Sequence, residues 1–101
     1  MWHKVAKFSE IEEGKSIVVN VDNKPIALFK TQGAVYALDN TCPHRGGPLG
    51  EGYLEGSEVT CPWHAWTFDV KTGDCQSAPG FKQTTYKVKV EGDDVAVEVD
   101  I

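Results

Sequence analysis

The sequence predicts an all-β fold, and two patterns in the chain support that prediction. Short segments rich in β-branched residues recur along the chain and are separated by turns built from Gly, Pro, Asn and Asp. Near the end, two runs that alternate apolar and polar residues flank a Gly/Asp turn, which is typical of a hairpin with one buried face. With 101 residues and no visible linker or repeat, the chain is expected to form a single domain over 1–101.

The predicted strands are separated by short connections. The first ends at Asp22-Asn23-Lys24-Pro25, a strong turn signal, and the next two flank Thr31-Gln32-Gly33 as a hairpin. Helix signals are weak: Ser9 and Glu12 have the spacing of a capping box, so one helical turn is expected there before Gly14. The predicted strands are 15–21, 26–30, 34–39, 58–61, 67–69, 86–90 and 95–99.

Composition and charge exclude several classes of function. Fifteen Asp and Glu against ten Lys and Arg give a formal net charge of -5, which argues against nucleic-acid binding because phosphate contacts require clustered basic residues. No apolar run approaches the roughly 18–20 residues that cross a bilayer, so no membrane segment is expected. Three Cys without a secretory signal do not suggest a disulfide framework, and we expect a reducing, cytoplasmic location.

Two short segments carry the residues with distinctive chemistry. Cys42-Pro43-His44 offers one thiol and one imidazole, and Cys61-Pro62-Trp63-His64 offers another pair, with sixteen residues between His44 and Cys61. Both lie in the Pro- and Gly-rich stretch 40–80, and loops of this composition between strands often carry function. Together the loops supply two soft sulfurs and two imidazole nitrogens.

Three interpretations of these four residues compete. They are core and loop residues without a metal, a Cys₂His₂ zinc site, or ligands of a [2Fe–2S] centre in which two His replace two Cys on one iron. Zinc fingers usually place both Cys in one knuckle and both His in another, whereas each loop here mixes the two types. Cys-x-His, a spacer in the middle teens and then Cys-x-x-His is a specific pattern for the iron–sulfur centre.

The two segments resemble the Rieske iron–sulfur family and are most similar to its small soluble ferredoxins. The resemblance implies a Rieske-type antiparallel β-sandwich with a small cluster-binding subdomain, at about 40–80, made of two Pro/Gly-rich loops. It also implies one [2Fe–2S] cluster, with Cys42 and Cys61 on the inner iron and His44 and His64 on the outer iron through Nδ1.

Departures from the respiratory branch of the family predict a low reduction potential. Gly47 and Trp63 stand where that branch carries an extra Cys in each loop, so the disulfide that joins its loops cannot form. Trp66 and Phe68 stand where it carries Ser and Tyr, whose hydroxyls donate hydrogen bonds toward sulfur. Because loss of donors destabilises the reduced, more negative cluster, a potential near the low end of the Rieske range is expected.

The remaining residues indicate an electron carrier and not an enzyme. After His44 and His64 only His3 remains, so the chain lacks the two His and one carboxylate that hold an oxygenase's mononuclear iron. A G-x-G-x-x-G nucleotide fingerprint is also missing. The resemblance implies a flavin-dependent NAD(P)H reductase as electron donor and a terminal oxygenase as acceptor.

Two alternative functions stay open at the level of sequence. The segment 42–49 is also similar to small subunits of assimilatory nitrite reductase, whose large subunit would then be the acceptor. A zinc-stabilised interaction module is the other. Cys75 has no place in the ligand pattern and is expected to be a small buried side chain, and His3 an ordinary strand residue. Ala78-Pro79-Gly80 resembles the proline-containing segment that covers the cluster in relatives.

Overall fold

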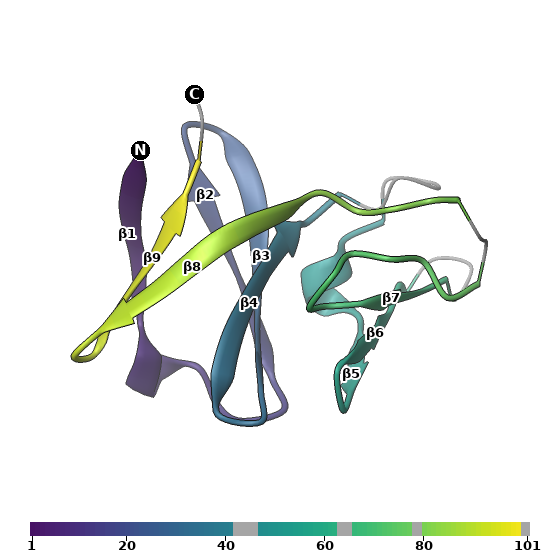
Figure 1. Cartoon of the computed structure of the whole chain (residues 1–101), viewed down its shortest axis with the longest axis horizontal. Helices are drawn as coiled ribbons and strands as arrows, with labels where there is room; N and C mark the ends of the chain where they lie inside the picture. The colour runs from purple at the N-terminus through teal and green to yellow at the C-terminus, as the bar shows by residue number, and fades with distance from the viewer. Residues whose placement is uncertain (42–46, 63–65, 78–79, 100–101) are drawn as a thin grey trace.

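The backbone consists almost entirely of β-strands and tight turns in a computed structural model, which describes residues 1–41, 47–62, 66–77 and 80–99 (Figure 1). Two short 3-10 helices, η1 (Phe8–Glu10) and η2 (Leu49–Glu51), interrupt the strands. The strands are β1 (Trp2–Lys7), β2 (Ser16–Val21), β3 (Lys24–Thr31), β4 (Ala34–Asp39), β5 (Tyr53–Glu55), β6 (Glu58–Thr60), β7 (Thr67–Asp69), β8 (Thr85–Glu91) and β9 (Asp94–Glu98).

These strands form two antiparallel sheets. The larger has the order β1-β9-β8-β4-β3-β2, and the smaller has the order β5-β6-β7. In Figure 1, β8 runs diagonally across the larger sheet in front of β3, and the small sheet lies to the right of β4. The predicted all-β class is confirmed.

Tight turns set the register of the long hairpins. Asp22 and Asn23 have positive φ angles of 48° and 68°, which is typical of the turn that joins twisted antiparallel strands in two residues. The predicted four-residue turn is therefore too long, because Lys24 and Pro25 already belong to β3 and pair with Val21 and Asn20. Pro25 fits there because it lies near the start of its strand.

Two apolar cores lie on opposite faces of β3 and β4. Successive side chains of a strand point to opposite faces, so Ile26 and Leu28 enter one core while Ala27 and Phe29 enter the other. The distal core contains Ile11, Val21, Ile26, Leu28, Val35, Ala37, Val95, Val97 and Val99. The loop-side core, against the small sheet, contains Ala27, Phe29, Leu38, Leu49, Val59, Cys61, Phe68, Val70 and Cys75.

The predicted helical turn forms, but earlier than expected and with a different cap. The 3-10 helix spans Phe8–Glu10, and Glu10 rather than Glu12 accepts the hydrogen bond from the Lys7 backbone N–H, at 2.9 Å. Ser9 is hydrogen-bonded to a residue that is distant in the sequence. Its N–H and its hydroxyl donate to the two carboxylate oxygens of Asp93 at 2.9 and 2.8 Å. A contact across 84 residues positions this helix, which local spacing does not reveal.

The Ser9–Asp93 contact predicts a pH-dependent contribution to stability. The Ser9 hydroxyl and then the Ser9 backbone N–H hold the pKa of the Asp93 carboxyl below its ordinary value. A carboxyl with a lowered pKa in the folded state stabilises the protein above its unfolded pKa, about 4, and loses that effect as the pH falls. Asp93→Asn should therefore lower the Tm at pH 7, and the difference from wild type should shrink toward about pH 2.

A matched variant separates this contact from a general effect of charge. Glu12→Gln also removes one exposed carboxylate, but the Glu12 side chain makes no hydrogen bond to any other residue that the structure describes. Thermal unfolding of both variants between pH 2 and 7 is the measurement. Equal, pH-independent shifts in Tm for the two variants would show that the Ser9–Asp93 contact contributes nothing.

Candidate metal centre

Of the four predicted ligands, Cys61 lies within the part of the chain that the structure describes. It directly follows β6, is 1% exposed and belongs to the loop-side core. Cys42, His44 and His64 lie outside the described residues. The flanks of both ligand segments are described, and they define where each loop starts and finishes.

The first ligand segment is closed at its base by paired backbone. Thr41 and Pro48 form an antiparallel bridge, and the Leu49 N–H donates to the Asn40 carbonyl at 2.8 Å. The Asn40 side chain accepts a further hydrogen bond from the Gly50 N–H at 2.7 Å. The residues on either side of 42–47 are thus tied together, which limits the separation of the loop's two ends.

Gly50 is required at the base of this first loop by close packing. A Cβ at position 50 would collide with a methyl group of Val18 and lie 2.8 Å from the Asn40 side-chain oxygen. The Gly50 carbonyl also accepts a hydrogen bond from the Ser16 hydroxyl at 2.7 Å. The loop base is therefore packed directly onto β2 of the larger sheet.

The second ligand segment is closed in the same way. The Cys61 N–H donates to the Trp66 carbonyl at 2.7 Å, so residues 61 and 66 are held together across the loop. Below this contact β6 and β7 pair, with Thr60 opposite Thr67 and their hydroxyl oxygens 3.4 Å apart. This second loop is therefore the connection of a short β-hairpin.

The bases of the two loops meet at one end of the molecule. Leu49, just after the first loop, and Cys61, at the start of the second, belong to the same apolar core. The hairpin of β5 and β6 joins them, with Tyr53 opposite Thr60. The two loops, whose residues His44 and Cys61 have sixteen residues between them in the sequence, therefore start from neighbouring points in space, as a shared site requires.

A third segment lies against the second loop. The Gln76 N–H donates to the Thr67 carbonyl at 2.7 Å, and the Thr67 N–H donates to the Ser77 hydroxyl at 3.0 Å. Trp66 and Phe81 make an edge-to-face ring contact with centroids 5.1 Å apart. These contacts hold the flanks of the predicted covering segment 78–80, of which residues 78–79 lie outside the described residues.

Cys75 and His3 are confirmed in the places expected for residues outside the ligand set. Cys75 is 7% exposed within the loop-side core, and His3 lies in β1 opposite Val97. Within 1–41, 47–62, 66–77 and 80–99, no three His, Cys, Asp or Glu side chains gather as a metal site.

The surroundings of Cys61 fit a sulfur ligand of an iron–sulfur cluster. Its side chain lies among apolar neighbours such as Leu49 and Phe68, each 0% exposed. An apolar shell limits solvent access and the local dielectric constant, both of which tune such a centre. The two thiols and two imidazoles that the sequence offers are the donor types that a mixed-ligand [2Fe–2S] centre requires.

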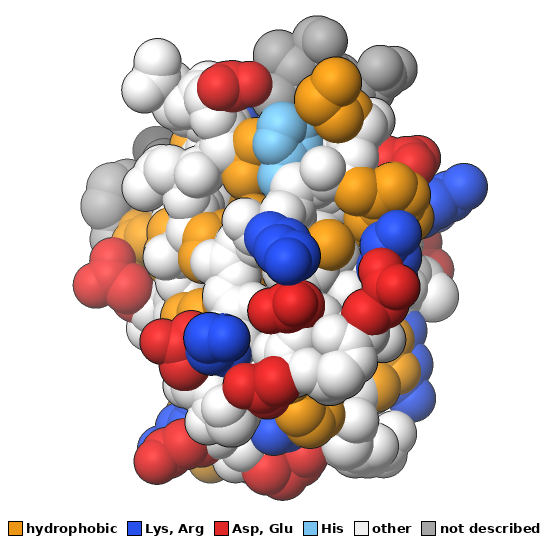
Figure 2. Space-filling model, turned by 90° about the vertical axis from the view of Figure 1, so that its left-hand side faces the viewer, with side chains coloured by type: hydrophobic (Ala, Val, Ile, Leu, Met, Phe, Trp, Pro, Cys, Tyr) orange, Lys and Arg blue, Asp and Glu red, His pale blue; other side chains and the backbone are white. Residues whose placement is uncertain are grey.

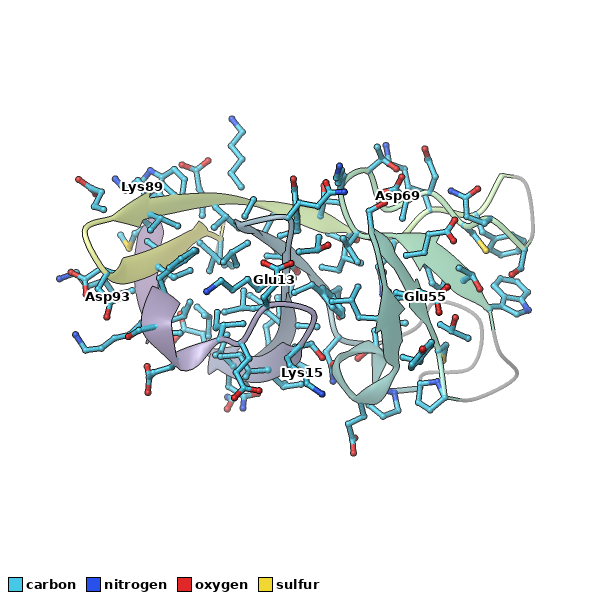
Figure 3. All side chains as sticks on the ribbon, turned by 90° about the horizontal axis from the view of Figure 1, so that it is seen from below. Glu13, Lys15, Glu55, Asp69, Lys89 and Asp93 are labelled. Carbon is cyan, nitrogen blue, oxygen red and sulfur yellow. The ribbon has the colours of Figure 1, made fainter. Side chains whose placement is uncertain are left out.

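Exposed carboxylates lie on the small sheet and on η2, with Glu55 and Glu58 at the β5–β6 turn, the end of that hairpin away from Cys61. Glu51, Glu55 and Glu58 are exposed on η2, β5 and β6, and Glu55 projects from the small sheet in Figure 3. None of the ion pairs found among the described residues involves these three glutamates. Those pairs join Lys4 and Lys7 to Asp94, and Lys89 to Glu91. The opposite end carries interspersed acidic and basic side chains (Figure 2).

Sequence reasoning missed one residue at this site. Gln83 is 4% exposed, and its side chain reaches the start of the first ligand loop. A single glutamine in a segment without a strand pattern gives no signal of burial, because its partners are backbone carbonyls more than forty residues earlier. The strand β5 was likewise not among the predicted strands.

The fold and the Cys/His pattern together favour one class, the small all-β iron–sulfur proteins. The family model of the Rieske [2Fe-2S] domain matches residues 1–97. The ferredoxin component of the naphthalene 1,2-dioxygenase system of Pseudomonas aeruginosa is 39% identical over 99 residues, which cover 97% of this chain and 95% of that protein. The chain therefore belongs to the Rieske [2Fe–2S] domain family and carries one such cluster.

Solved structures extend the comparison to the fold. A chain from the complex of reduced oxygenase and oxidized ferredoxin in carbazole 1,9a-dioxygenase is 34% identical, with a TM-score of 0.88 over 95% of this chain and 91% of that chain. A chain assigned to the small subunit of an NADPH nitrite reductase is 20% identical with a TM-score of 0.85, and this likeness shows the fold alone. The family match favours the iron–sulfur interpretation over the zinc module.

Proposed function

We propose that this chain is the ferredoxin of a ring-oxidising dioxygenase system, with Cys42 and Cys61 as ligands of one iron and His44 and His64 as ligands of the other. The observation that carries the proposal is that both Cys/His loops start from one apolar core, which contains the Cys61 side chain. The relatives named as ferredoxin components of dioxygenase systems support it.

The chain's own residues have three tasks in this function. The bound cluster supplies a centre that accepts and returns one electron. The loop-side core, which includes Leu49 and Phe68, keeps water from the buried Cys61 side chain, and the bridge from Thr41 to Pro48 keeps the ends of the first loop together. We place the cluster-binding subdomain at about 40–80 within one domain of 1–101, since the small sheet and both loop bases fall in that range.

The proposed partners are a flavin-dependent NAD(P)H reductase as donor and a terminal oxygenase as acceptor. The exposed Glu51, Glu55 and Glu58 favour partners that present basic side chains, and complementary charge mainly raises the rate of encounter. A cytoplasmic location is part of this proposal. None of the described helical segments has the length or apolar character of a bilayer-spanning helix.

Reconstitution of electron transfer tests the proposed function. The purified protein should be red-brown, contain iron and sulfide, and carry electrons from an NADH-dependent ferredoxin reductase to a Rieske aromatic-ring dioxygenase. Gel filtration of the endogenous protein should separate it from large catalytic subunits. Stoichiometric co-elution with a nitrite reductase large subunit would contradict the proposal and favour the alternative function.

The reduction potential is expected near the low end of the Rieske range. Phe68 is 0% exposed and has no polar atom, so position 68 cannot donate a hydrogen bond toward cluster sulfur. Position 66 is Trp, which has no hydroxyl. A redox titration should give a midpoint on the order of -150 mV rather than +300 mV. A midpoint well above zero would contradict the argument from missing hydroxyl donors.

A further inference from the structure

Buried polar side chains are rare in the described part of the chain. Thr31, 3% exposed, and Gln83, 4% exposed, are the two non-apolar side chains that the structure buries there. A buried polar group is costly unless it is hydrogen-bonded, so each must gain its partners inside the fold. The positions of those partners indicate what each residue holds together.

Every polar atom of the Gln83 side-chain amide is hydrogen-bonded to backbone. Its Nε2 donates to the Asp39 carbonyl at 2.8 Å and to the Thr41 carbonyl at 2.6 Å. Its Oε1 accepts from the Thr84 N–H at 2.9 Å. Both amide protons are therefore used between the end of β4 and the start of the first ligand loop.

The backbone of Gln83 is fixed to a third segment. Its N–H donates to the Gly73 carbonyl at 2.7 Å, and a Cβ on Gly73 would collide with the Gln83 carbonyl oxygen. One residue beyond, the Thr84 carbonyl accepts from the Asp39 N–H at 2.9 Å. Gln83 thus joins the start of the first loop to the segment that lies against the second loop.

We propose that Gln83 is a positioning residue that holds the first ligand loop against the rest of the site, in place of a covalent link between the loops. Positions 47 and 63 are Gly and Trp, so no disulfide can join the loops there. The Thr41 carbonyl belongs to the planar peptide unit that leads into Cys42, and fixing it restrains the backbone at this proposed ligand. The inference rests on the ligand set given under the proposed function.

Only an amide performs this task at position 83. Leucine has a similar volume but no donor, so Gln83→Leu leaves the Asp39 and Thr41 carbonyls without the partner that the structure gives them. A glutamate would direct a carboxylate at the same two carbonyl oxygens. Gln83→Leu is therefore the informative variant, because it removes the hydrogen bonds with little change in packing volume.

Two variants provide matched controls. Thr31→Val also removes a buried side chain-to-backbone hydrogen bond, since the Thr31 hydroxyl donates to the Gly56 carbonyl at 2.6 Å, but it joins β3 to the β5–β6 turn and not to a ligand loop. Gln76→Leu makes the same chemical change as Gln83→Leu at an exposed position in the neighbouring segment.

The experiment compares cluster release with global stability in the holoprotein. Loss of visible absorption in excess chelator is followed while far-UV circular dichroism reports the folded sheet, and visible circular dichroism and the midpoint potential report the geometry around the cluster. Gln83→Leu should release its cluster at least about tenfold faster than wild type and alter the visible spectrum, as expected when support around a metal site is lost. Thr31→Val and Gln76→Leu should stay within about twofold.

The possible outcomes distinguish a failure of the role proposed for Gln83 from a failure of the proposed function. If Gln83→Leu releases its cluster no faster than Thr31→Val at an equal loss of unfolding free energy, with an unchanged visible spectrum, Gln83 is an ordinary core residue and the inference fails. Wild-type protein that binds no [2Fe–2S] cluster would instead overturn the proposed function. Should Gln83→Leu not fold, Gln83→Asn, which keeps the amide but shortens its reach, should show the same faster release in weaker form.

Discussion

Cys61→Ser is expected to leave the protein without its cluster, whereas the same substitution at Cys75 should leave the cluster in place. The two cysteines are matched in their surroundings, since both are buried in the loop-side core at 1% and 7% exposure. Loss of either thiol therefore has a similar effect on packing. They differ in position: Cys61 starts the second ligand loop, while Cys75 pairs with Phe68 beside β7.

Iron analysis and visible absorption measure this difference directly. Cys75→Ser should retain about two irons per chain and a visible spectrum like that of the wild type, and Cys61→Ser should retain almost none, because a serine hydroxyl is a harder and weaker ligand than a thiolate. Far-UV circular dichroism of both variants checks that the sheets form. Equal iron content in the two variants, or loss of iron in Cys75→Ser alone, would contradict the ligand assignment.

The strands that the sequence predicts best are those buried on one or both faces with turns at both ends. The segment 34–39 was predicted with its observed bounds, because β4 alternates between two cores and is bounded by a tight turn. Asp22 and Asn23 carry the positive φ angles that their residue types tolerate. Local pattern and tertiary packing agree in these elements, so the sequence alone was sufficient.

The elements that the sequence does not predict depend on contacts from distant parts of the chain. The 3-10 helix at Phe8–Glu10 is placed by Asp93, and the short strand β5 exists because its backbone pairs with β6. At the site, ligand types and spacing identify Cys61, but they carry no information on Gln83, whose partners are backbone carbonyls. Residue types therefore do not reveal which side chains support a site through hydrogen bonds to backbone carbonyls.

The larger sheet separates the protein into two cores with different tasks. In β3, the Leu28 side chain lies in the distal core and the Phe29 side chain lies in the loop-side core, so adjacent residues pack in different cores. The described bases of both ligand loops contribute side chains to the loop-side core, which contains Leu49 and Cys61. Substitutions that destabilise the two cores equally should therefore lower global stability equally. Only the substitution in the loop-side core should weaken retention of the cluster.

Leu49→Ala and Leu28→Ala test this separation with one chemical change. Both leucines are 0% exposed, and truncating a buried leucine lowers the free energy of unfolding by about 2–5 kcal/mol, a large share of the roughly 5–15 kcal/mol of a typical domain. Leu49 follows Pro48 at the base of the first ligand loop, and Leu28 faces the distal core. Only Leu49→Ala should therefore loosen the cluster while the protein remains folded.

Denaturant unfolding and chelator-induced bleaching together distinguish the two effects. Both variants should unfold at lower urea concentration than wild type, with similar shifts in the midpoint. In the absence of urea, Leu49→Ala should bleach faster than wild type, because a cavity beside Cys61 allows the loop base to move and admits solvent. Leu28→Ala should bleach at nearly the wild-type rate until urea unfolds it. Equal bleaching of the two variants would mean that the cores act as one unit and that the cluster depends on global stability alone.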